Sequence, residues 1–514
     1  MTSQLEEQLA LLPSRLSQHL GLSLVALAVG VALSVPLSLL AVRFRVFRWV
    51  VLTGAGVVQA IPGLALLALM VPGFDLLRRH VFPSLSAFGF WPAAAALILY
   101  SMLPLLRNTV TGLRSIDPTL LEAARGLGMT SRQTLVRVQV PLAAPVILAG
   151  LRTSVVWTVG VATLSTPVGQ PSLGNFIFSG LQTRNWAAVV VGCVAAAGLA
   201  LFLDATVGLF EAAVEKRSRA RAWVATAISV AVLLLGAWPF LASRGPSPVR
   251  IGAKTFTEQY VLAEVLATSA ERAGLPTSRV GSLGSTIVFD ALVSGELDAY
   301  VDYTGTIWAN HLGRTDVADA DTVLAEVTRW LAEKHQVTCV GRLGFENAYA
   351  LAMRRDRAEA LGVKTISQLA PMMAGLKLGS DYEFFSRPEW KRLSQLYQLK
   401  PAEQVSFDSS FMYKAVQSGE VDVITAFSSD GRIAAFDLVV LEDPLHALPP
   451  YDAVLLLGPR ADTHPGLREA LQPLVGAIDV KAMRHANELV DLQGASRTEA
   501  ARWLREAAHL DAPK

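Results

Sequence analysis

Charged residues and cysteine are both scarce in this 514-residue chain. Asp, Glu, Lys and Arg make up 17% of it, against about 25% in ordinary soluble domains, and hydrophobic residues make up 52%. The two cysteines are Cys193, in an apolar run, and Cys339, in a more polar region, and neither belongs to a metal-ligand cluster. A disulfide between such different surroundings is not expected. The composition therefore favours a membrane protein without a metal site.

The net charge of +2 conceals two halves of opposite sign. Residues 1–245 carry 18 basic and 8 acidic side chains, whereas the remainder carries 27 and 35. Neither half has the clustered basic surface typical of nucleic-acid-binding proteins. We expect a basic membrane domain at 1–242, a short linker at 243–248 and an acidic water-soluble domain at 249–514.

Long apolar runs occur only in the first half, and six of them are about long enough to cross a bilayer. They lie at residues 20–41, 49–72, 89–106, 143–166, 186–210 and 222–242. The second is interrupted by "IPG" at 61–63, and the fourth contains Arg152. The first run is too long, and its flank too acidic, for a cleaved signal peptide, so we expect it to remain in the membrane.

Basic residues are distributed unequally between alternate loops, which predicts an orientation. The loops after spans one, three and five hold twelve, namely Arg43, Arg45, Arg48, Arg107, Arg114, Arg125, Arg132, Arg137, Lys216, Arg217, Arg219 and Arg221. The other side holds five, namely Arg15, Arg78, Arg79, Arg184 and Arg244. The richer side is expected to be cytoplasmic, with both termini outside; a span count wrong by one would reverse the side of the C-terminal domain.

The loop at 122–141, "EAARGLGMTSRQTLVRVQVP", predicts a short helix, a glycine turn and a second amphipathic stretch that runs to the next span. An ordinary amphipathic loop on the lipid surface is the simplest alternative. The spacing of Glu122, Ala123, Ala124, Gly128 and Pro141, however, resembles the EAA loop of ABC importer permeases. The resemblance implies a type I permease fold with six spans, a cytoplasmic ABC ATPase docked at this loop, and a homodimer, since such importers need two permease halves.

ATP hydrolysis is not expected of this chain itself. A G-x-x-x-x-G-K-[ST] phosphate loop is missing, and "GAKT" at 252–255 lacks the upstream glycine. No G-x-S-x-G sequence or nucleophile–base spacing suggests an enzyme. We expect a transport subunit with no catalytic residue and no cofactor.

The C-terminal half alternates strand-like and helix-like segments, which favours an α/β fold with mostly parallel sheets. Strands are expected at "VRIGAK", "LDAYVDY", "ENAYALAM", "LKLGS", "VDVITAF" and "DAVLLLG". The phrases "IGAKTFTEQYVLAEVLA", "GSTIVFDALVSGELDAYVDYTGT", "GFENAYALAM", "AFSSDGRI" and "PPYDAV" resemble the binding proteins for glycine betaine, carnitine and choline, including those of related ergothioneine importers. The resemblance implies a two-lobed periplasmic-binding-protein fold, with lobe one at 249–345 and 450–514 and lobe two at 346–449.

The resemblance also implies a ligand site. Aromatic faces attract trimethylammonium groups, and the family's cage corresponds to Tyr303, Tyr349, Phe427 and Tyr451, with Phe427 where the closest betaine binders have Tyr. The family's carboxylate clamp corresponds to Lys254, Thr306 and Arg387. Taken singly, each aromatic residue is more simply explained as core packing. Asp302, Asp430, Trp308 and Tyr382 are weaker candidates, which solvated charge or edge packing explains as well.

Local patterns support the clamp independently of the resemblance. Thr255-x-x-Glu258 and Ser386-x-x-Glu389 have the spacing of capping boxes, which would place Lys254 and Arg387 beside helix N-termini. Helix N-termini favour anions, such as a ligand carboxylate.

The function expected from these features is the import of a trimethylammonium zwitterion, such as glycine betaine, carnitine, proline betaine or ergothioneine. The chain would lie in the bacterial cytoplasmic membrane, with its binding domain outside. A choline importer of the same architecture is one alternative, and a membrane-anchored ligand sensor is another. A sensor needs a cytoplasmic output module, and the longest expected cytoplasmic segment is the 122–141 loop.

Overall fold

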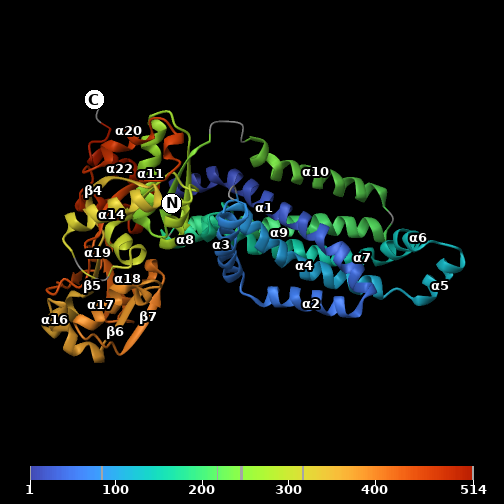
Figure 1. The fold of residues 1–514 in the computed structure, drawn as a ribbon, viewed down its shortest axis with the longest axis horizontal. Helices are drawn as coiled ribbons and strands as arrows, with labels where there is room; N and C mark the ends of the chain where they lie inside the picture. Colours follow the sequence, from blue (N-terminus) through green and yellow to red (C-terminus); the bar gives the residue numbers. More distant parts are fainter. Residues whose placement is uncertain are drawn as a thin grey trace. The chain divides into compact units, whose positions relative to one another are not determined.

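The chain folds into two compact units in the computed structural model, which describes residues 2–82, 85–183, 185–216, 218–242, 247–314, 316 and 318–511 (Figure 1). The helical unit comprises Gln8–Ile177 and Val189–Gly245, and the other comprises Pro246–Lys514 with Met1–Glu7 and Phe178–Ala188. Most of the predicted linker, and Arg184, Arg217 and Arg244 of the orientation argument, lie outside the described residues.

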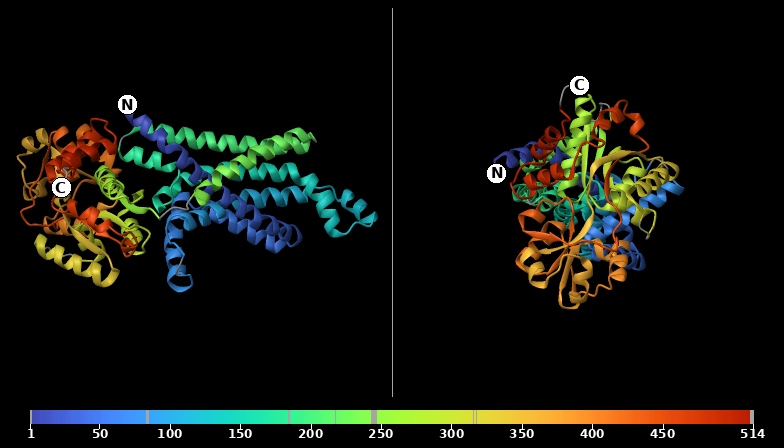
Figure 2. Two further views of the ribbon diagram at one scale, coloured as in Figure 1. Left: turned by 90° about the horizontal axis from the view of Figure 1, so that it is seen from above. Right: turned by 90° about the vertical axis from the view of Figure 1, so that its left-hand side faces the viewer.

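All the secondary-structure elements in the described first half of the chain are helices, joined by short loops. Its helices are α1 (Thr2–Arg43), α2 (Arg45–Ala60), α3 (Gly63–His80), α4 (Phe90–Arg114), α5 (Pro118–Gly126), α6 (Ser131–Thr134), η1 (Leu135–Gln139), α7 (Val140–Ala162), η2 (Thr163–Val168), α8 (Gly174–Gln182), α9 (Trp186–Glu215) and α10 (Arg219–Ala242). Five helical segments are long and apolar enough to cross a membrane, and α2 with α3 makes a sixth if the bent pair counts as one span. The predicted count of six is reached only if this pair counts as one span. Figure 2 shows several of the long helices running alongside one another.

The predicted interruption at residues 61–63 is confirmed. Helices α2 and α3 meet there at an angle of 104°, so α3 stands across the other long helices in Figure 1. Pro62 has no amide hydrogen to continue a helix and favours an extended residue before it. Ile61 is accordingly extended, and its carbonyl accepts the hydroxyl of Tyr100 from α4.

The segment that leads into α7 fits the prediction that the next span begins at Pro141, since α7 begins at Val140. A π-helical turn, η1, joins α6 to α7, and Pro141 lies in the first turn of α7. Pro141 has no amide hydrogen to donate to the preceding turn, and η1 lies directly before it. Ser131–Val168 nevertheless forms one continuous helical segment.

The soluble domain contains two five-stranded sheets. The first has the order β2-β1-β3-β10-β4, and the second has the order β7-β6-β8-β5-β9. Their strands are β1 (Val249–Lys254), β2 (Thr277–Leu283), β3 (Ala299–Tyr303), β4 (Thr338–Glu346), β5 (Tyr349–Arg354), β6 (Lys377–Asp381), β7 (Glu403–Phe407), β8 (Val423–Phe427), β9 (Leu438–Val440) and β10 (Asp452–Leu457). All six predicted strands are present.

The expectation of mostly parallel sheets is wrong, because both sheets are mixed. In the first sheet β1 pairs in parallel with β2 and β3, but β10 is antiparallel to β3 and β4. In the second sheet β6 pairs in parallel with β7 and β8, but β5 is antiparallel to β8 and β9. The chain enters the second sheet through β5 and returns to the first through β10. Each of these two strands runs antiparallel to both of its neighbours in the sheet that it enters.

Helices cover these sheets. They are α11 (Thr257–Arg272), α12 (Ser285–Val293), α13 (Thr304–Thr306), η3 (Ile307–His311), α14 (Ala320–His335), α15 (Arg355–Leu361), α16 (Ile366–Leu369), η4 (Ala370–Gly375), η5 (Phe384–Ser386), α17 (Pro388–Leu396), α18 (Ser409–Ser418), α19 (Arg432–Ala435), η6 (Ala461–Thr463), α20 (Leu467–Leu471), η7 (Gln472–Leu474), α21 (Val480–Asp491) and α22 (Arg497–Ala507). Helix α11 buries Val261, Leu262, Val265 and Leu266 in the core that also contains β1 and β3. This packing holds the start of α11 beside the ends of both strands.

Candidate functional site

Three of the predicted site residues lie where central strands end. Lys254, Tyr303 and Phe427 are the last residues of β1, β3 and β8, and Asp381 is the last residue of β6. The carboxyl ends of parallel strands are the usual place for a ligand crevice in α/β folds. Between the sheets, Tyr349 begins β5 and Tyr451 directly precedes β10, and the amide of Asn347 donates to the carbonyl of Tyr451 at 3.0 Å.

Aromatic rings from these positions meet. Tyr349 pairs with Phe427 across the β5–β8 ladder, with ring centroids 5.0 Å apart, and lies 5.9 Å from Tyr451. Phe256 stacks on Phe427 at 5.8 Å and on Tyr303 at 6.2 Å. The structure thus brings the four predicted aromatic residues into one group.

Two members of this group were missed from the sequence. Phe256 follows Lys254 by two residues, and Phe384 packs on Tyr349 with centroids 4.8 Å apart. Each lies within three residues of a predicted clamp residue, in "KTF" and "FFSR", and this closeness in the sequence could have identified them. The six residues Phe256, Tyr303, Tyr349, Phe384, Phe427 and Tyr451 are called the aromatic cluster below.

Lys254 is buried and already ion-paired. Its ammonium contacts the Asp302 carboxylate and lies 5.2 Å from the centroid of the Tyr303 ring. Asp302 also accepts the hydroxyl of Tyr300 and the amide of Tyr303. The interpretation of Asp302 as a solvated or edge residue is therefore wrong, because every residue of β3 is buried.

Arg387 has similar surroundings. Its guanidinium bonds to Glu389 at 2.8 Å and reaches Glu383 at 3.3 Å. The Cζ atom lies 5.2 Å from the centroid of the Tyr349 ring. Both predicted clamp cations thus lie against rings of the aromatic cluster, and each has a buried carboxylate partner.

Neither predicted capping box forms. Helix α11 begins at Thr257 after Phe256, and α17 begins at Pro388 after Arg387, with no side-chain cap at either end. The hydroxyl of Ser386 bonds back to the carbonyl of Glu383 instead. Glu389 instead forms the ion pair with Arg387, and Glu258 accepts the hydrogen bonds described in the next paragraph.

Glu258 is a buried acid on which four neutral donors converge. Its oxygens accept the Tyr303 hydroxyl, the amides of Asn347 and Asn487 at 3.0 and 3.2 Å, and the Ser429 hydroxyl. Burial raises the pKa of Glu258, and the hydrogen bonds only partly offset this effect. No lysine, arginine or histidine in the described part of the chain forms an ion pair with it.

The remaining candidates differ in position. Thr306 is buried in α13, one turn after Tyr303. Trp308 is fully buried, with its indole bonded to the Asp316 carbonyl, which fits core packing. Asp430 is buried and paired with Arg432 at 2.6 Å, so solvated charge does not describe it. Tyr382 is 70% exposed and lies outside the aromatic cluster.

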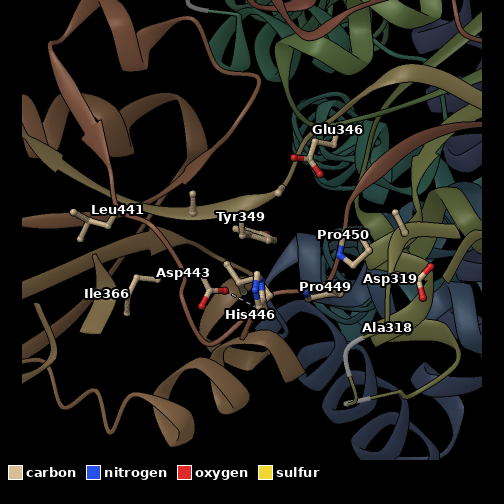
Figure 3. A pocket seen from close by; sticks show the side chains of 14 residues that line it. Ala318, Asp319, Glu346, Tyr349, Ile366, Leu441, Asp443, His446, Pro449 and Pro450 are labelled. Carbon is tan, nitrogen blue, oxygen red and sulfur yellow. Dashed lines mark hydrogen bonds between the residues drawn. The ribbon is translucent and has the colours of Figure 1, made fainter. Parts of the chain in front are cut away.

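Two hollows adjoin this region. One of about 20 Å³ is bordered by Phe256, Glu258, Phe427 and Ser429, among others, and has room for about one water molecule. The other, of about 550 Å³, lies beside the two segments that connect the sheets, one between β4 and β5 and the other between β9 and β10. Figure 3 shows Tyr349 in its lining with Glu346, Asp443 and His446, but no other member of the aromatic cluster borders it.

In the helical unit the 122–141 loop has the predicted shape. Glu122, Ala123 and Ala124 lie in α5, and Gly128 turns the chain with φ of +76°. Thr130 then caps α6 with a capping box. Leu127, between the two helices, is 83% exposed, so the turn presents an apolar side chain outward.

Sequence comparisons cover both halves of the chain. The family described as the substrate binding domain of ABC-type glycine betaine transport system matches residues 247–506. The family described as the binding-protein-dependent transport system inner membrane component matches residues 28–219. The chain belongs to the ABC-type glycine betaine transport family.

Individual relatives agree with this assignment. The ergothioneine transport permease/ergothioneine binding protein EgtU of Helicobacter pylori is 29% identical over 84% of this chain and 78% of the relative. The osmoprotectant import permease protein OsmW of Salmonella typhimurium is 41% identical over 36% of this chain and 84% of the relative. The carnitine transport binding protein OpuCC of Listeria monocytogenes is 30% identical over 49% of this chain and 84% of the relative.

This member of the ABC-type glycine betaine transport family is an importer permease fused to a substrate-binding domain. It is an integral membrane protein and a transport protein, and its permease family implies an ABC ATPase partner. The fold expected from the sequence, a helical membrane domain followed by an α/β binding-protein domain, is confirmed.

Proposed function

We propose that this chain captures a small trimethylammonium zwitterion outside the cytoplasmic membrane and imports it. The observation that carries the proposal is the meeting of the aromatic cluster with two buried cations at the ends of β1, β3 and β8. Glycine betaine, carnitine and ergothioneine combine a trimethylammonium group with a carboxylate, and proline betaine combines a dimethylated ring ammonium with a carboxylate. The names of the relatives cover ergothioneine, carnitine and osmoprotectants.

The aromatic cluster suits the cationic end of such a ligand. A trimethylammonium group spreads its charge over methyl groups and has no hydrogen to donate, so ring faces are its natural partners. Tyr303 and Phe256 come from the first sheet's side, and Tyr349 and Phe427 from the second. We propose that the ligand lies between Tyr303, Tyr349, Phe427 and Tyr451.

The carboxylate end would be held by Lys254, Thr306 and Arg387. The two cations are close to the rings, at 5.2 Å in each case, so a short zwitterion could reach both groups. Their ion pairs with Asp302 and Glu389 oppose this role, because a ligand carboxylate would have to share each cation with a protein carboxylate. That observation specifically favours choline, which lacks a carboxylate, as the second candidate.

Import would require the two lobes, assigned to 249–345 with 450–514 and to 346–449, to separate and close around the ligand. The hollow beside Phe256 and Phe427 is far smaller than any trimethylammonium compound, so the stacked rings must move apart for entry. Hinge-type binding proteins undergo such motions. We further propose a homodimer of the chain, driven by a separate ATPase that docks at Glu122, Ala123, Ala124 and Gly128.

Calorimetric titration of the full-length chain in nanodiscs tests the ligand class. Glycine betaine, carnitine, ergothioneine and choline are added in turn, and one zwitterion is expected to bind more tightly than choline. The variant Tyr349→Leu should lose about 3- to 30-fold in affinity for that ligand. Tyr382→Leu is the matched control, because Tyr382 is exposed outside the aromatic cluster.

Each outcome has a clear meaning. Tighter binding of choline would favour the choline alternative and reject the clamp. Binding that survives Tyr349→Leu unchanged would reject the site. No binding of any of the four compounds would contradict the proposed function.

A further inference from the structure

A buried carboxylate stands behind each tyrosine of the aromatic cluster. The Tyr303 hydroxyl donates to Glu258, the Tyr349 hydroxyl to Asp381 at 3.0 Å, and the Tyr451 hydroxyl to Glu389. These acids come from three separate elements, namely α11, the end of β6 and α17. The same hydrogen bond, from a tyrosine hydroxyl to a buried carboxylate, thus occurs three times, and a different part of the chain supplies the acid each time.

The three carboxylates are compensated differently. Glu389 forms an ion pair with Arg387 at 2.8 Å. Asp381 accepts the amides of Glu383 and Phe384 at 2.7 and 2.9 Å. Glu258 accepts only neutral donors from the described residues, as shown above. Among the residues that the structure describes, no side-chain cation forms an ion pair with Glu258 or Asp381.

We infer that Glu258 and Asp381 are positioning residues that make the tyrosines of the aromatic cluster selective for a cationic head group. This inference rests on the proposed function, because it concerns the same site. A phenol that donates to a carboxylate becomes richer in electrons, which strengthens the attraction between its ring face and a cation. The hydrogen bond also fixes the direction of the ring.

The same hydrogen bonds decide which part of a ligand the cluster recognises. A hydroxyl that donates to a protein carboxylate is not free to donate to a ligand carboxylate. The tyrosines therefore offer their faces rather than their hydroxyls. Glu258 and Asp381 add negative potential behind those faces, and an uncharged ligand of the same shape gains nothing from it.

Glu258 also connects the two sheets. Its helix α11 packs on the first sheet, whereas Ser429, which donates to it, follows β8 of the second sheet. Asn487 donates to both Glu258 and the carbonyl of Ser429. Because Phe427 precedes Ser429 by two residues, Glu258 holds aromatic residues of both sheets in one arrangement.

A pair of probes separates charge from shape. Choline and 3,3-dimethyl-1-butanol have nearly the same shape, but a neutral carbon replaces the ammonium nitrogen in the second. Their affinities for the full-length chain in nanodiscs are measured by calorimetry for wild type, Glu258→Gln, Tyr303→Phe and the double variant. Glu264→Gln is the matched control, because Glu264 lies on the same helix but pairs with Arg279.

Glu258→Gln is expected to lower the affinity for choline about tenfold and to leave that for 3,3-dimethyl-1-butanol nearly unchanged. In the Tyr303→Phe background the same substitution should have a much smaller effect, because the hydroxyl that joins the two residues is gone. Glu264→Gln should resemble wild type. If Glu258→Gln fails to fold, Asp381→Asn with Tyr349→Phe provides the same cycle at the second tyrosine.

Two results would overturn the inference alone. One is an equal loss of affinity for both probes, which would indicate a merely structural role, and the other is additive effects of the paired substitutions. A wild-type chain that binds neither choline nor any trimethylammonium zwitterion would instead overturn the proposed function, and the inference with it.

pH provides a further readout of the same pair. Acidification should weaken choline binding in wild type as Glu258 becomes protonated, and Glu258→Gln should reduce this dependence. The other charged groups on the surrounding elements include Lys254 with Asp302, Asp430 with Arg432, and Arg484, His485, Glu488 and Asp491 of α21. They are the same in both chains, so the difference between the two profiles reports on Glu258. Identical profiles would count against the inference.

Discussion

The helical unit and the binding domain satisfy their polar side chains in different ways. In the helical unit, hydroxyls such as those of Ser23, Ser101 and Thr206 bond to carbonyls three or four residues earlier in the same helix. In the binding domain, buried acids such as Asp381 and Glu258 accept hydrogen bonds from partners 32 to 229 residues away. Local satisfaction suits a segment surrounded by lipid, where each helix must be nearly self-sufficient. Long-range satisfaction ties separate elements together and shapes a site.

The helical unit has a notable exception to this rule. Arg152 in α7 bonds to both oxygens of Asp204 at 2.9 and 2.8 Å and to Glu211 at 2.9 Å, and both acids lie in α9. His19 likewise joins α1 to the carbonyl of Val159 and the amide of Leu173. These contacts identify the positions where the helical unit depends on tertiary structure as strongly as the binding domain does.

The largest effect is expected from Arg152→Leu. Without the guanidinium, Asp204 and Glu211 become uncompensated charges inside apolar helices, each at a cost on the order of 3 kcal/mol. The yield of monodisperse protein in fluorescence-detected size-exclusion chromatography should fall strongly. Thr153→Ala is the control, because the Thr153 hydroxyl bonds only within its own helix. A normal yield of Arg152→Leu would show that the ion pairs of Arg152 with Asp204 and Glu211 contribute little to the stability of the helical unit.

An intermediate effect is expected in the 122–141 loop, where the fold depends on local backbone geometry. Gly128→Ala places a side chain at φ of +76°, at a cost of roughly 1–2 kcal/mol. Ligand-stimulated ATP hydrolysis by the complex with its ATPase should fall several-fold, with ligand affinity unchanged. Gly126→Ala is the matched control, since an added Cβ meets nothing at either glycine and Gly126 is helical. Equal activities would argue against a coupling role for this turn.

The smallest effect concerns the stability of the binding domain and its dependence on pH. Burial raises the pKa of Glu258, so the folded state binds this proton more tightly than the unfolded state does. Wild type should therefore lose stability relative to Glu258→Gln as pH rises above the ordinary range of a glutamate pKa and through the raised pKa of Glu258. The measurement is the difference in Tm between the two chains at each pH. His311, whose pKa burial lowers to about 4, contributes to both chains alike. A constant difference would mean that Glu258 does not titrate in this range.

Much of the fold was predictable because its signals are local. Apolar run length predicted the long helices, Pro62 the bend, and Gly128 the turn of the 122–141 loop. Period and composition located six strands of the soluble domain. Each of these features depends on the conformational preferences of a few adjacent residues.

The errors share a cause, which is competition from distant residues. Thr255-x-x-Glu258 and Ser386-x-x-Glu389 have the spacing of capping boxes, but tertiary partners bind both glutamates instead. Asp302 looked solvated because its partner Lys254 is 48 residues away. The mixed sheets were missed because the direction of β5 and β10 depends on how the chain crosses between the sheets.

The sequence by itself determined the segments of this protein, namely which stretches are apolar helices, where they bend, and which stretches are strands. It also identified the family through motifs in both halves. Only the tertiary structure decided how the charges are used: Lys254 faces Asp302, Arg387 faces Glu389, and each tyrosine of the aromatic cluster donates to its own acid. The physical reason is that a buried charge takes whichever partner the folded chain brings near it, which is 48 residues away for Lys254 and Asp302 but only two for Arg387 and Glu389.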